Sequence, residues 1–432
     1  MNRKKIRNFS LIFVIFSSIL LLSFYPIFNK INAENKNTTN EIIPVVFLHG
    51  FMGYGRVEET VFKKQYWGNN VCDLQEYLNN QGYITMTAAV APFSSNWHRA
   101  CEFYAYVKGG TVDYGEYTAN KFGHSRYGRT YPGIYPQWDK EHPIHIVAHS
   151  QGGQTARVLA HLLNYGFADE INYNQNSISN LFSHNPSNKG MIKSITTIAT
   201  PHDGTTATEV ADAITGHNTF KLFPFLNFIN GKYENTRFFD YQLEYWGLHK
   251  QDNESLLEFY QRNKNNKAWT QEKAFGMYDL SPIGAKELNS WVKDVDDIYY
   301  FSYACQKTRE KRTIFGTINY YVQIDVKNIA TTVSAKVIAK TASSYPLYEI
   351  DSKYNHNDGV VNTYSAIAPH IGRNSTTIRF ISQHSRNIEP GVWNSFGIVQ
   401  DTDHNQICGM FPNKYLDIKE FYINHLNFLK KL

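Results

Sequence analysis

The stretch "IHIVAHSQGGQTARVLAHLL", residues 144–163, decides the fold. An apolar run, typical of a strand buried on both faces, stops at Ser150, and two glycines follow within three residues. A helical pattern of apolar residues then begins. Its positions are Val158, Leu159, Leu162 and Leu163. The pattern therefore predicts a serine held on a tight turn between a buried strand and a helix.

This turn has the composition of a nucleophile elbow, A-H-S-Q-G, with Ala148 in place of the usual first glycine. Small residues are needed at positions 148 and 152, because the chain packs closely against itself where the hydroxyl is pushed above the sheet edge. The amide of Gln151 then supplies half of an oxyanion hole. A serine that merely caps a helix is the alternative, and the strand before it and the helix after it favour the elbow.

A second oxyanion donor is expected from the loop after an earlier strand. The segment "FLHGFMGYGR", residues 47–56, supplies it, since His49 and Gly50 end a strand and the amide of Phe51 follows. An ordinary glycine-rich turn is the alternative. The position of this segment upstream of a serine elbow favours the oxyanion loop.

A serine nucleophile needs a histidine base and an orienting acid, and in this kind of fold they follow in the order acid, then histidine. Asp358 lies in a turn, in "NHNDGVVNTYS", and His404 lies in a loop, in "DTDHNQICG", just before the last helix. We therefore predict the triad Ser150, Asp358 and His404. Asp401 and Asp403 are the rivals for the acid, but they are too near His404 in the sequence to approach it from a separate loop.

Strand-like runs alternate with helical patterns along the chain, which predicts a mostly parallel sheet with helices on both faces. The predicted strands are "IIPVVFLHG", "ITMTAAVAP", "PIHIVAHS", "MIKSITTIATPHDGT", "DIYYFSYA" and "TIRFIS". Helices are also predicted at "DLQEYLNNQGY" and at the tail "DIKEFYINHLNFLKKL", the latter capped by Asp417.

Two stretches do not fit the alternation. Residues 93–132 are rich in Tyr, Gly, His and Arg, and we predict a small inserted subdomain there. Residues 206–248 include a Phe-rich run, and we predict a lid at about 206–232. A buried core helix is the alternative for the Phe-rich run, because clusters of apolar side chains are usually core.

Residues 1–33 are predicted to be a secretory signal peptide, because basic residues, an apolar core and a small-residue site before Glu34 follow in that order. An uncleaved anchor helix is the alternative. Residues 34–432 are then predicted to form one secreted catalytic domain.

Composition narrows the class of protein further. The hydrophobic content of 42% supports a sizeable core. The net charge of +5 comes partly from the first residues, and no basic block interleaved with aromatic residues follows, so a nucleic-acid partner is not expected. The cysteines are scattered, which favours buried free thiols and leaves one disulfide open. They are Cys72, Cys101, Cys305 and Cys408.

With these residues in place, the sequence resembles the secreted true lipases of Gram-positive bacteria, of the staphylococcal and thermostable bacillary type. The phrases that carry the resemblance are "VVFLHGFMGYGR", "SSNWHRACEFY", "GGTVDYG", "GHSRYGRTYPG", "VAHSQGGQTAR", "TTIATPHDGTT", "YWGL", "NDGVVNT" and "GVWNSFG…DH". The resemblance implies the α/β-hydrolase fold, the same triad, an oxyanion hole from the Phe51 and Gln151 amides, and the helical lid.

The resemblance also implies a zinc-bearing insertion with two carboxylates and two histidines. The matching positions are His98, Thr118, His124 and Glu244. Threonine is a poor zinc ligand, so we predict structural zinc on His98, His124 and Glu244, with water or Glu116 as the fourth ligand. A site without metal is the alternative.

Calcium near the catalytic histidine is typical of this family, but it is not expected here. The positions where acids would follow His404 hold Gln406 and Phe411, with Pro412 retained, and calcium prefers several charged oxygen ligands.

These residues predict a secreted carboxylic ester hydrolase, a triacylglycerol lipase acting on lipid esters at an oil–water interface through an acyl-enzyme. The chemistry requires no cofactor, and no protein partner is implied. One alternative keeps the triad and changes the substrate to phospholipids, short soluble esters or aliphatic polyesters. A remote alternative is a non-catalytic lipid-binding protein on a hydrolase scaffold.

Overall fold

The computed structural model describes residues 42–432, apart from 57, 58, 60–63, 215–241, 250, 252, 323–328 and 342–348. The chain divides into two compact units, residues 1–42 and 43–432, and the elements below belong to the second. The predicted signal peptide and most of the predicted lid lie outside the described residues.

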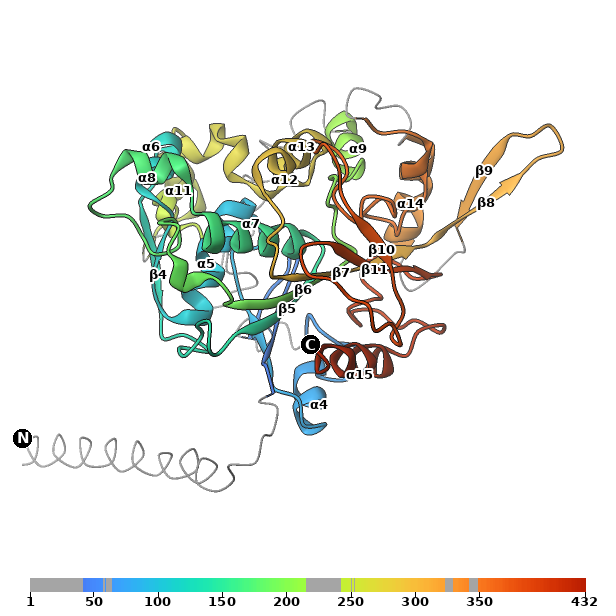
Figure 1. The fold of residues 1–432 in the computed structure, drawn as a ribbon. Helices are drawn as coiled ribbons and strands as arrows, with labels where there is room; N and C mark the ends of the chain where they lie inside the picture. Colours follow the sequence, from blue (N-terminus) through green and yellow to red (C-terminus); the bar gives the residue numbers. More distant parts are fainter. Residues whose placement is uncertain are drawn as a thin grey trace, which may run out of the picture. The chain divides into compact units, whose positions relative to one another are not determined.

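In the described part of the chain, seven strands form one sheet in the order β10-β11-β7-β6-β5-β1-β2 (Figure 1). Every neighbouring pair in it is parallel, as predicted. The strands are β1 (Val45–Leu48), β2 (Thr85–Ala88), β5 (Ile144–His149), β6 (Ile192–Ile198), β7 (Tyr299–Gln306), β10 (Ile378–Phe380) and β11 (Trp393–Gln400).

Both faces of the central strands of this sheet are buried, which explains why these strands are nearly continuous apolar runs. In β1, Val46 and Leu48 face one apolar core. Val45 and Phe47 face the other. All six residues of β5 are buried.

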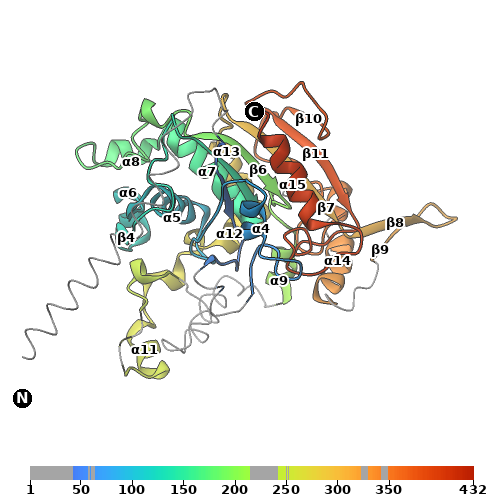
Figure 2. The same cartoon turned by 90° about the horizontal axis from the view of Figure 1, so that it is seen from below.

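Helices cover the two faces (Figure 1). One core receives side chains from α5 (Asn96–Lys108), α7 (Gln151–Tyr165) and α13 (Pro282–Trp291). The other receives them from α4 (Leu74–Asn80) and α15 (Ile418–Leu429), and Figure 2 shows α15 lying along β7 and β11. The predicted α/β layering is therefore confirmed.

The other α-helices of the described residues lie mostly in the connections. They are α6 (Glu116–Phe122), α8 (Ala168–Tyr173), α9 (Ala207–Ile214), α11 (Leu256–Asn263), α12 (Gly276–Leu280) and α14 (Ile329–Thr341). The predicted cap of the last helix is confirmed, since the Asp417 carboxylate accepts the amides of Lys419 and Glu420. Among the described residues, no helix combines the length and the apolar character needed to cross a bilayer.

Within the residues that the structure describes, two antiparallel pairs of strands stand apart from the main sheet. β3 (Gly110–Asp113) pairs with β4 (Tyr127–Tyr131) inside the predicted insertion, next to α5 and α6. β8 (Thr308–Arg312) pairs with β9 (Ile318–Val322) as a hairpin that extends away from the sheet in Figure 1. The sequence patterns did not predict these four strands, nor β11. All four cysteines, which the structure describes, are free thiols, and three of them are buried.

Candidate active site

Ser150 lies on a strained turn at the carboxyl end of β5. Its backbone has φ 55° and ψ −130°, a conformation that residues other than glycine rarely adopt and that costs about 1–3 kcal/mol. The Ser150 amide donates to the Ile198 carbonyl of β6 at 2.9 Å. A Cβ on Gly152 would lie 2.7 Å from the carbonyl oxygens of Leu48 and His49. This close approach is the one predicted for a serine elbow.

The loop after β1 lies directly against this turn. A Cβ on Gly50 would lie 2.5 Å from the Cβ of Ser150 and 3.1 Å from its Oγ, so only glycine fits there. Phe51 follows, with its ring edge-to-face on Phe93 at 5.1 Å. Gln151 begins α7, where amides point away from the helix without intrahelical acceptors. The two predicted oxyanion donors thus belong to segments that flank Ser150.

A buried arginine holds the loop after β1 in place. The Arg99 guanidinium donates to the carbonyl of His49 at 2.6 Å and to that of Ala91 at 2.9 Å, and its Nε donates to Thr155 Oγ1 at 3.1 Å. Burial lowers the pKa of Arg99 to about 10, so the group stays charged at neutral pH. It fixes these carbonyls and so the direction of the amides beside them.

Asp358 and His404, which are far apart in sequence, meet as predicted. His404 Nδ1 lies 2.8 Å from Asp358 Oδ2, and the His404 amide donates to the Asp358 carbonyl at 3.1 Å. Asp358 Oδ1 accepts the amides of Val360 at 2.9 Å and Val361 at 2.7 Å. Both side chains are buried. The carboxylate therefore holds the imidazole with a proton on Nδ1, which leaves Nε2 as an acceptor.

The other two candidate acids engage different partners. Asp401 forms an ion pair with Arg309, whose Nε lies 2.9 Å from its Oδ1. Asp403 Oδ1 accepts the amides of Asn405 and Gln406, both at 2.9 Å. Both carboxylates therefore bind partners other than the His404 imidazole.

His149, the residue before Ser150, connects the two catalytic loops. Its Nε2 lies 2.8 Å from the His404 carbonyl, which only accepts, so Nε2 carries the proton. Its Nδ1 therefore accepts from the Tyr66 hydroxyl at 2.6 Å, and the Tyr66 oxygen accepts the Gly50 amide at 3.0 Å. Burial lowers the pKa of His149 well below the ordinary value, which keeps the ring neutral. The chain of bonds runs from the oxyanion loop to the histidine loop.

The predicted zinc ligands are only partly assembled. Nε2 of His98 lies 3.0 Å from Nε2 of His124. Glu244 instead forms an ion pair with Arg129 and is 46% exposed. The part of the chain that the structure describes holds no group of three or more His, Cys, Asp or Glu placed to bind a metal. Two nitrogens are fewer than the four ligands of a structural zinc site, so these residues as placed do not fit zinc.

The other two positions of that set are also engaged. Thr118 is buried, and its amide donates to Glu170 at 2.8 Å. Glu116 forms an ion pair with Arg126 at 3.0 Å.

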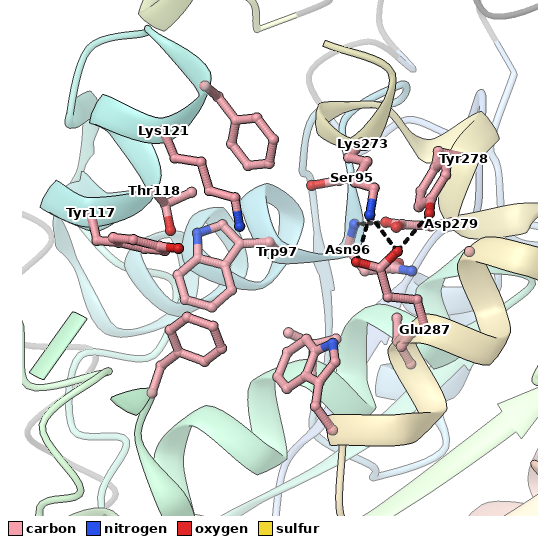
Figure 3. A pocket seen from close by; sticks show the side chains of 16 residues that line it. Ser95, Asn96, Trp97, Tyr117, Thr118, Lys121, Lys273, Tyr278, Asp279 and Glu287 are labelled. Carbon is pink, nitrogen blue, oxygen red and sulfur yellow. Dashed lines mark hydrogen bonds and ion pairs between the residues drawn. The ribbon is translucent and has the colours of Figure 1, made fainter. Parts of the chain in front are cut away.

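A separate cavity of about 150 Å³ lies between α5, α6 and α13 (Figure 3). Aromatic side chains line much of it, including Trp97 and Trp291, and an ion pair between Lys273 and Glu287 lies on one wall, at 2.6 Å. Neither Ser150 nor the pair of Asp358 and His404 lines this cavity. It is therefore not where an ester would meet the serine.

Three residues of the site were not predicted from the sequence: Tyr66, Arg99 and His149. His149 and Arg99 carried a signal, because a histidine inside a buried strand and an arginine inside a buried helix need partners. Tyr66 carried none, since it is one of 30 tyrosines.

Sequence comparisons identify the family to which the chain belongs. The family of lipase-like C-terminal domains matches residues 40–431. The lipase of Staphylococcus hyicus is 34% identical over 405 residues, which cover 93% of this chain and 57% of that protein. The chain thus spans little more than half the length of the curated relatives it matches.

Solved structures agree as well. S. hyicus lipase superposes with a TM-score of 0.78 at 30% identity, over 92% of this chain and 98% of that one. The structure of EstA from Clostridium botulinum gives 0.76 at 41% identity, over 93% and 90%. Lipase 1 from Pelosinus fermentans gives 0.72 at 37% identity, over 90% and 99%. The predicted α/β-hydrolase fold and family resemblance are therefore confirmed, and the chain belongs to the family of lipase-like C-terminal domains.

Proposed function

We propose that this chain is a secreted carboxylic ester hydrolase that cleaves acylglycerols at an oil–water interface. The observation that carries the proposal is the buried pair of Asp358 and His404 beside the strained turn of Ser150. The relatives named lipase support the substrate class. The family resemblance implies that such lipases are secreted, which supports an extracellular location for this chain.

In the acylation step, Ser150 Oγ attacks the ester carbonyl carbon while His404 Nε2 takes the hydroxyl proton. The carbonyl electrons move onto the oxygen, and Asp358 stabilises the imidazolium through the Nδ1 hydrogen bond. Collapse of the tetrahedral intermediate expels the alcohol, to which His404 returns the proton. A water molecule then cleaves the acyl-enzyme by the same steps, and the fatty acid leaves.

The amides of Phe51 and Gln151 bind the oxyanion in this proposal. They would gain most of their strength in the transition state, when the oxygen carries charge, so they lower the barrier and not merely the KM. Loss of one such donor typically slows catalysis by about 10²–10³-fold. Arg99 and Tyr66 act indirectly, because they hold the backbone from which these donors project.

The loop after His404 is expected to work without calcium. The Gln406 side chain accepts the Asp403 amide at 3.0 Å and donates to the Pro412 carbonyl at 3.0 Å. The ammonium of Lys307 lies 3.6 Å from Asp403 Oδ2, in a buried position. A protein cation therefore already faces the carboxylate, and an unchanged melting temperature with calcium or a chelator is the expected result.

Structural zinc remains a prediction, because side chains would have to move from their present positions to complete the ligand set. Burial lowers the pKa of His98 and of His124, so both rings are neutral and able to bind metal. Glu244 would have to leave Arg129 to join them. Such zinc would brace the insertion and take no part in the ester chemistry.

The decisive experiment compares the purified chain with its Ser150→Ala variant on a long-chain triacylglycerol emulsion and on a soluble butyrate ester. Hydrolysis of the emulsion that vanishes in the variant is the expected result. Hydrolysis of the soluble ester alone would move the proposal to a short-chain esterase. Silence of folded protein on both substrates would overturn it.

A further inference from the structure

The β8–β9 hairpin carries an apolar tip that the fold itself does not use. Ile314 is 94% exposed and Phe315 is 88% exposed. Single exposed apolar residues are common, but two adjacent large ones at the end of a projecting element form a patch that water disfavours.

The tip is held in a defined conformation. The Thr313 amide donates to the Thr317 carbonyl at 2.8 Å, and the Gly316 amide donates to the Thr313 carbonyl at 3.0 Å. Gly316 has φ +82°, which glycine adopts without strain. Ile314 and Phe315 thus occupy the middle of a closed turn, so little conformational entropy would be lost when they enter another phase.

The hairpin is rooted at the catalytic loops. The amides of Lys307 and Thr308 donate to the Asn357 carbonyl at 2.9 and 3.2 Å, and the Asn357 amide donates to Thr308 Oγ1 at 3.0 Å. Asn357 immediately precedes Asp358. β7, from which the hairpin leaves, is parallel to β6, which is parallel to β5. The hairpin therefore starts at the sheet edge that also carries Ser150.

Charge beside the tip selects the kind of partner. Lys311 and Arg312 are exposed at the end of β8, next to the apolar turn. Arg309 and Glu310, nearer the root, are engaged with Asp401 and His356. An apolar tip with a basic collar matches a lipid surface that carries negative charge, where the tip enters the acyl region and the cations remain at the anionic head groups. Charged side chains along β8 disfavour pairing with a second copy of this chain.

We propose that the β8–β9 hairpin anchors the protein on anionic lipid surfaces through Ile314 and Phe315, with Lys311 and Arg312 as the electrostatic collar. This inference deepens the proposed function and rests on it for its purpose, since the anchor would bring the catalytic edge of the sheet to its substrate. Burying an Ile or Phe side chain favours transfer by about tenfold to a hundredfold. Each basic residue near an anionic surface adds about fivefold.

Binding is tested apart from catalysis in the Ser150→Ala background. Sedimentation with vesicles of equal parts phosphatidylcholine and phosphatidylglycerol measures the partition coefficient. Changing both Ile314→Ser and Phe315→Ser should lower it by about a hundredfold or more. Changing both Lys311→Gln and Arg312→Gln should lower it by about twentyfold on these vesicles and leave it unchanged on phosphatidylcholine alone.

A matched control is Phe380→Ser on β10, which removes another exposed aromatic ring, 71% exposed, and should leave partitioning unchanged. An equal loss in this control, or no loss in the tip variant, would overturn the anchor. So would a wild-type dimer that the tip variant converts to monomer with vesicle binding intact, because the tip would then join two copies. Hydrolysis of soluble butyrate ester should be the same with and without the tip. Vesicle binding by Ser150→Ala does not depend on ester cleavage, so failure of the proposed function is recognised separately.

Discussion

Replacement of Tyr66 by phenylalanine tests whether the Tyr66 hydroxyl, which links the oxyanion loop to His149 beside Ser150, holds that loop in position. The ring packs between Trp67, at 5.4 Å, and Tyr54, at 5.7 Å, and both contacts survive in Tyr66→Phe. Only the hydroxyl is lost, together with its bonds to the Gly50 amide and to His149 Nδ1. His149 cannot compensate by moving its proton, because Nε2 would then face the His404 carbonyl without one.

The size of the effect follows from these two orphaned groups. A buried polar group without a partner costs about 1–3 kcal/mol, so the free energy of unfolding should fall by about 2–6 kcal/mol. A loosened Gly50 displaces the Phe51 amide beside it. Because complete loss of an oxyanion donor costs about 10²–10³-fold, we expect kcat to fall by roughly tenfold or more, with KM nearly unchanged.

The assay is kcat and KM on a soluble butyrate ester, with urea unfolding in parallel. Tyr83→Phe is the matched control, since its hydroxyl donates to Asn427 Oδ1 at 2.7 Å in another part of the fold. Both variants should lose stability, and only Tyr66→Phe should lose kcat. An unchanged kcat in Tyr66→Phe would refute the positioning role, and unchanged stability would refute the hydrogen bonds themselves.

Three further outcomes are expected. Asp358→Asn should lower kcat by about 10⁴-fold on the soluble ester, because the amide no longer holds the His404 tautomer; a loss below tenfold would assign the acid elsewhere. Acid should destabilise the fold, because burial lowers the pKa of three core histidines to about 3: His49, His145 and His425. Their folded pKa values lie below the unfolded value of 6.5, so the stability they contribute is present above pH 6.5 and is lost, by about 1.4 kcal/mol per pH unit each, as pH falls toward 3. Glu102 and Asp279, whose pKa values burial raises to about 7, act in the opposite direction between about pH 4.5 and 7 and offset two of the three histidines. Urea midpoints that do not fall between pH 6.5 and pH 5 would contradict this balance. Metal analysis of protein purified without chelators decides the zinc prediction: zinc-free wild-type protein is what the placed side chains favour and would discard it, whereas about one zinc per chain that His124→Ala removes would show that Glu244 leaves Arg129 to join the histidine pair.

The central strands could be predicted because burial on both faces leaves a plain apolar signature, as in β5 before Ser150. β11 escaped prediction for the opposite reason. Asn394 and Ser395 in this strand are polar and fully buried, and each has a hydrogen-bond partner outside the strand. Ser302 Oγ donates to Ser395 Oγ at 3.0 Å, and Asn394 Nδ2 donates to the Glu389 carbonyl at 2.9 Å. A buried strand that carries polar residues lacks the nearly continuous apolar run by which such strands are recognised in a sequence.

The candidate triad could be predicted because each of its members has a local cue and a fixed order along the chain. Arg99 and Tyr66 have no such order. Their role exists only once α5 and the loop before α4 have closed on the end of β1, which brings side chains up to 83 residues apart into contact, as for Tyr66 and His149. The position of Glu244 is a similar case, since its place in the sequence did not reveal that it would pair with Arg129.

These contacts separate two kinds of residue by what their loss should change. Tyr66 and Arg99 bond backbone groups of the oxyanion loop, so stability and kcat should fall together when they are replaced. Ile314 and Phe315 are almost fully exposed, so their replacement should leave both quantities intact and alter only the surfaces that the protein reaches. A soluble substrate reports on the first group and is blind to the second, whereas an emulsion reports on both. The ratio of the two activities in one variant therefore assigns it to the catalytic scaffold or to the anchor.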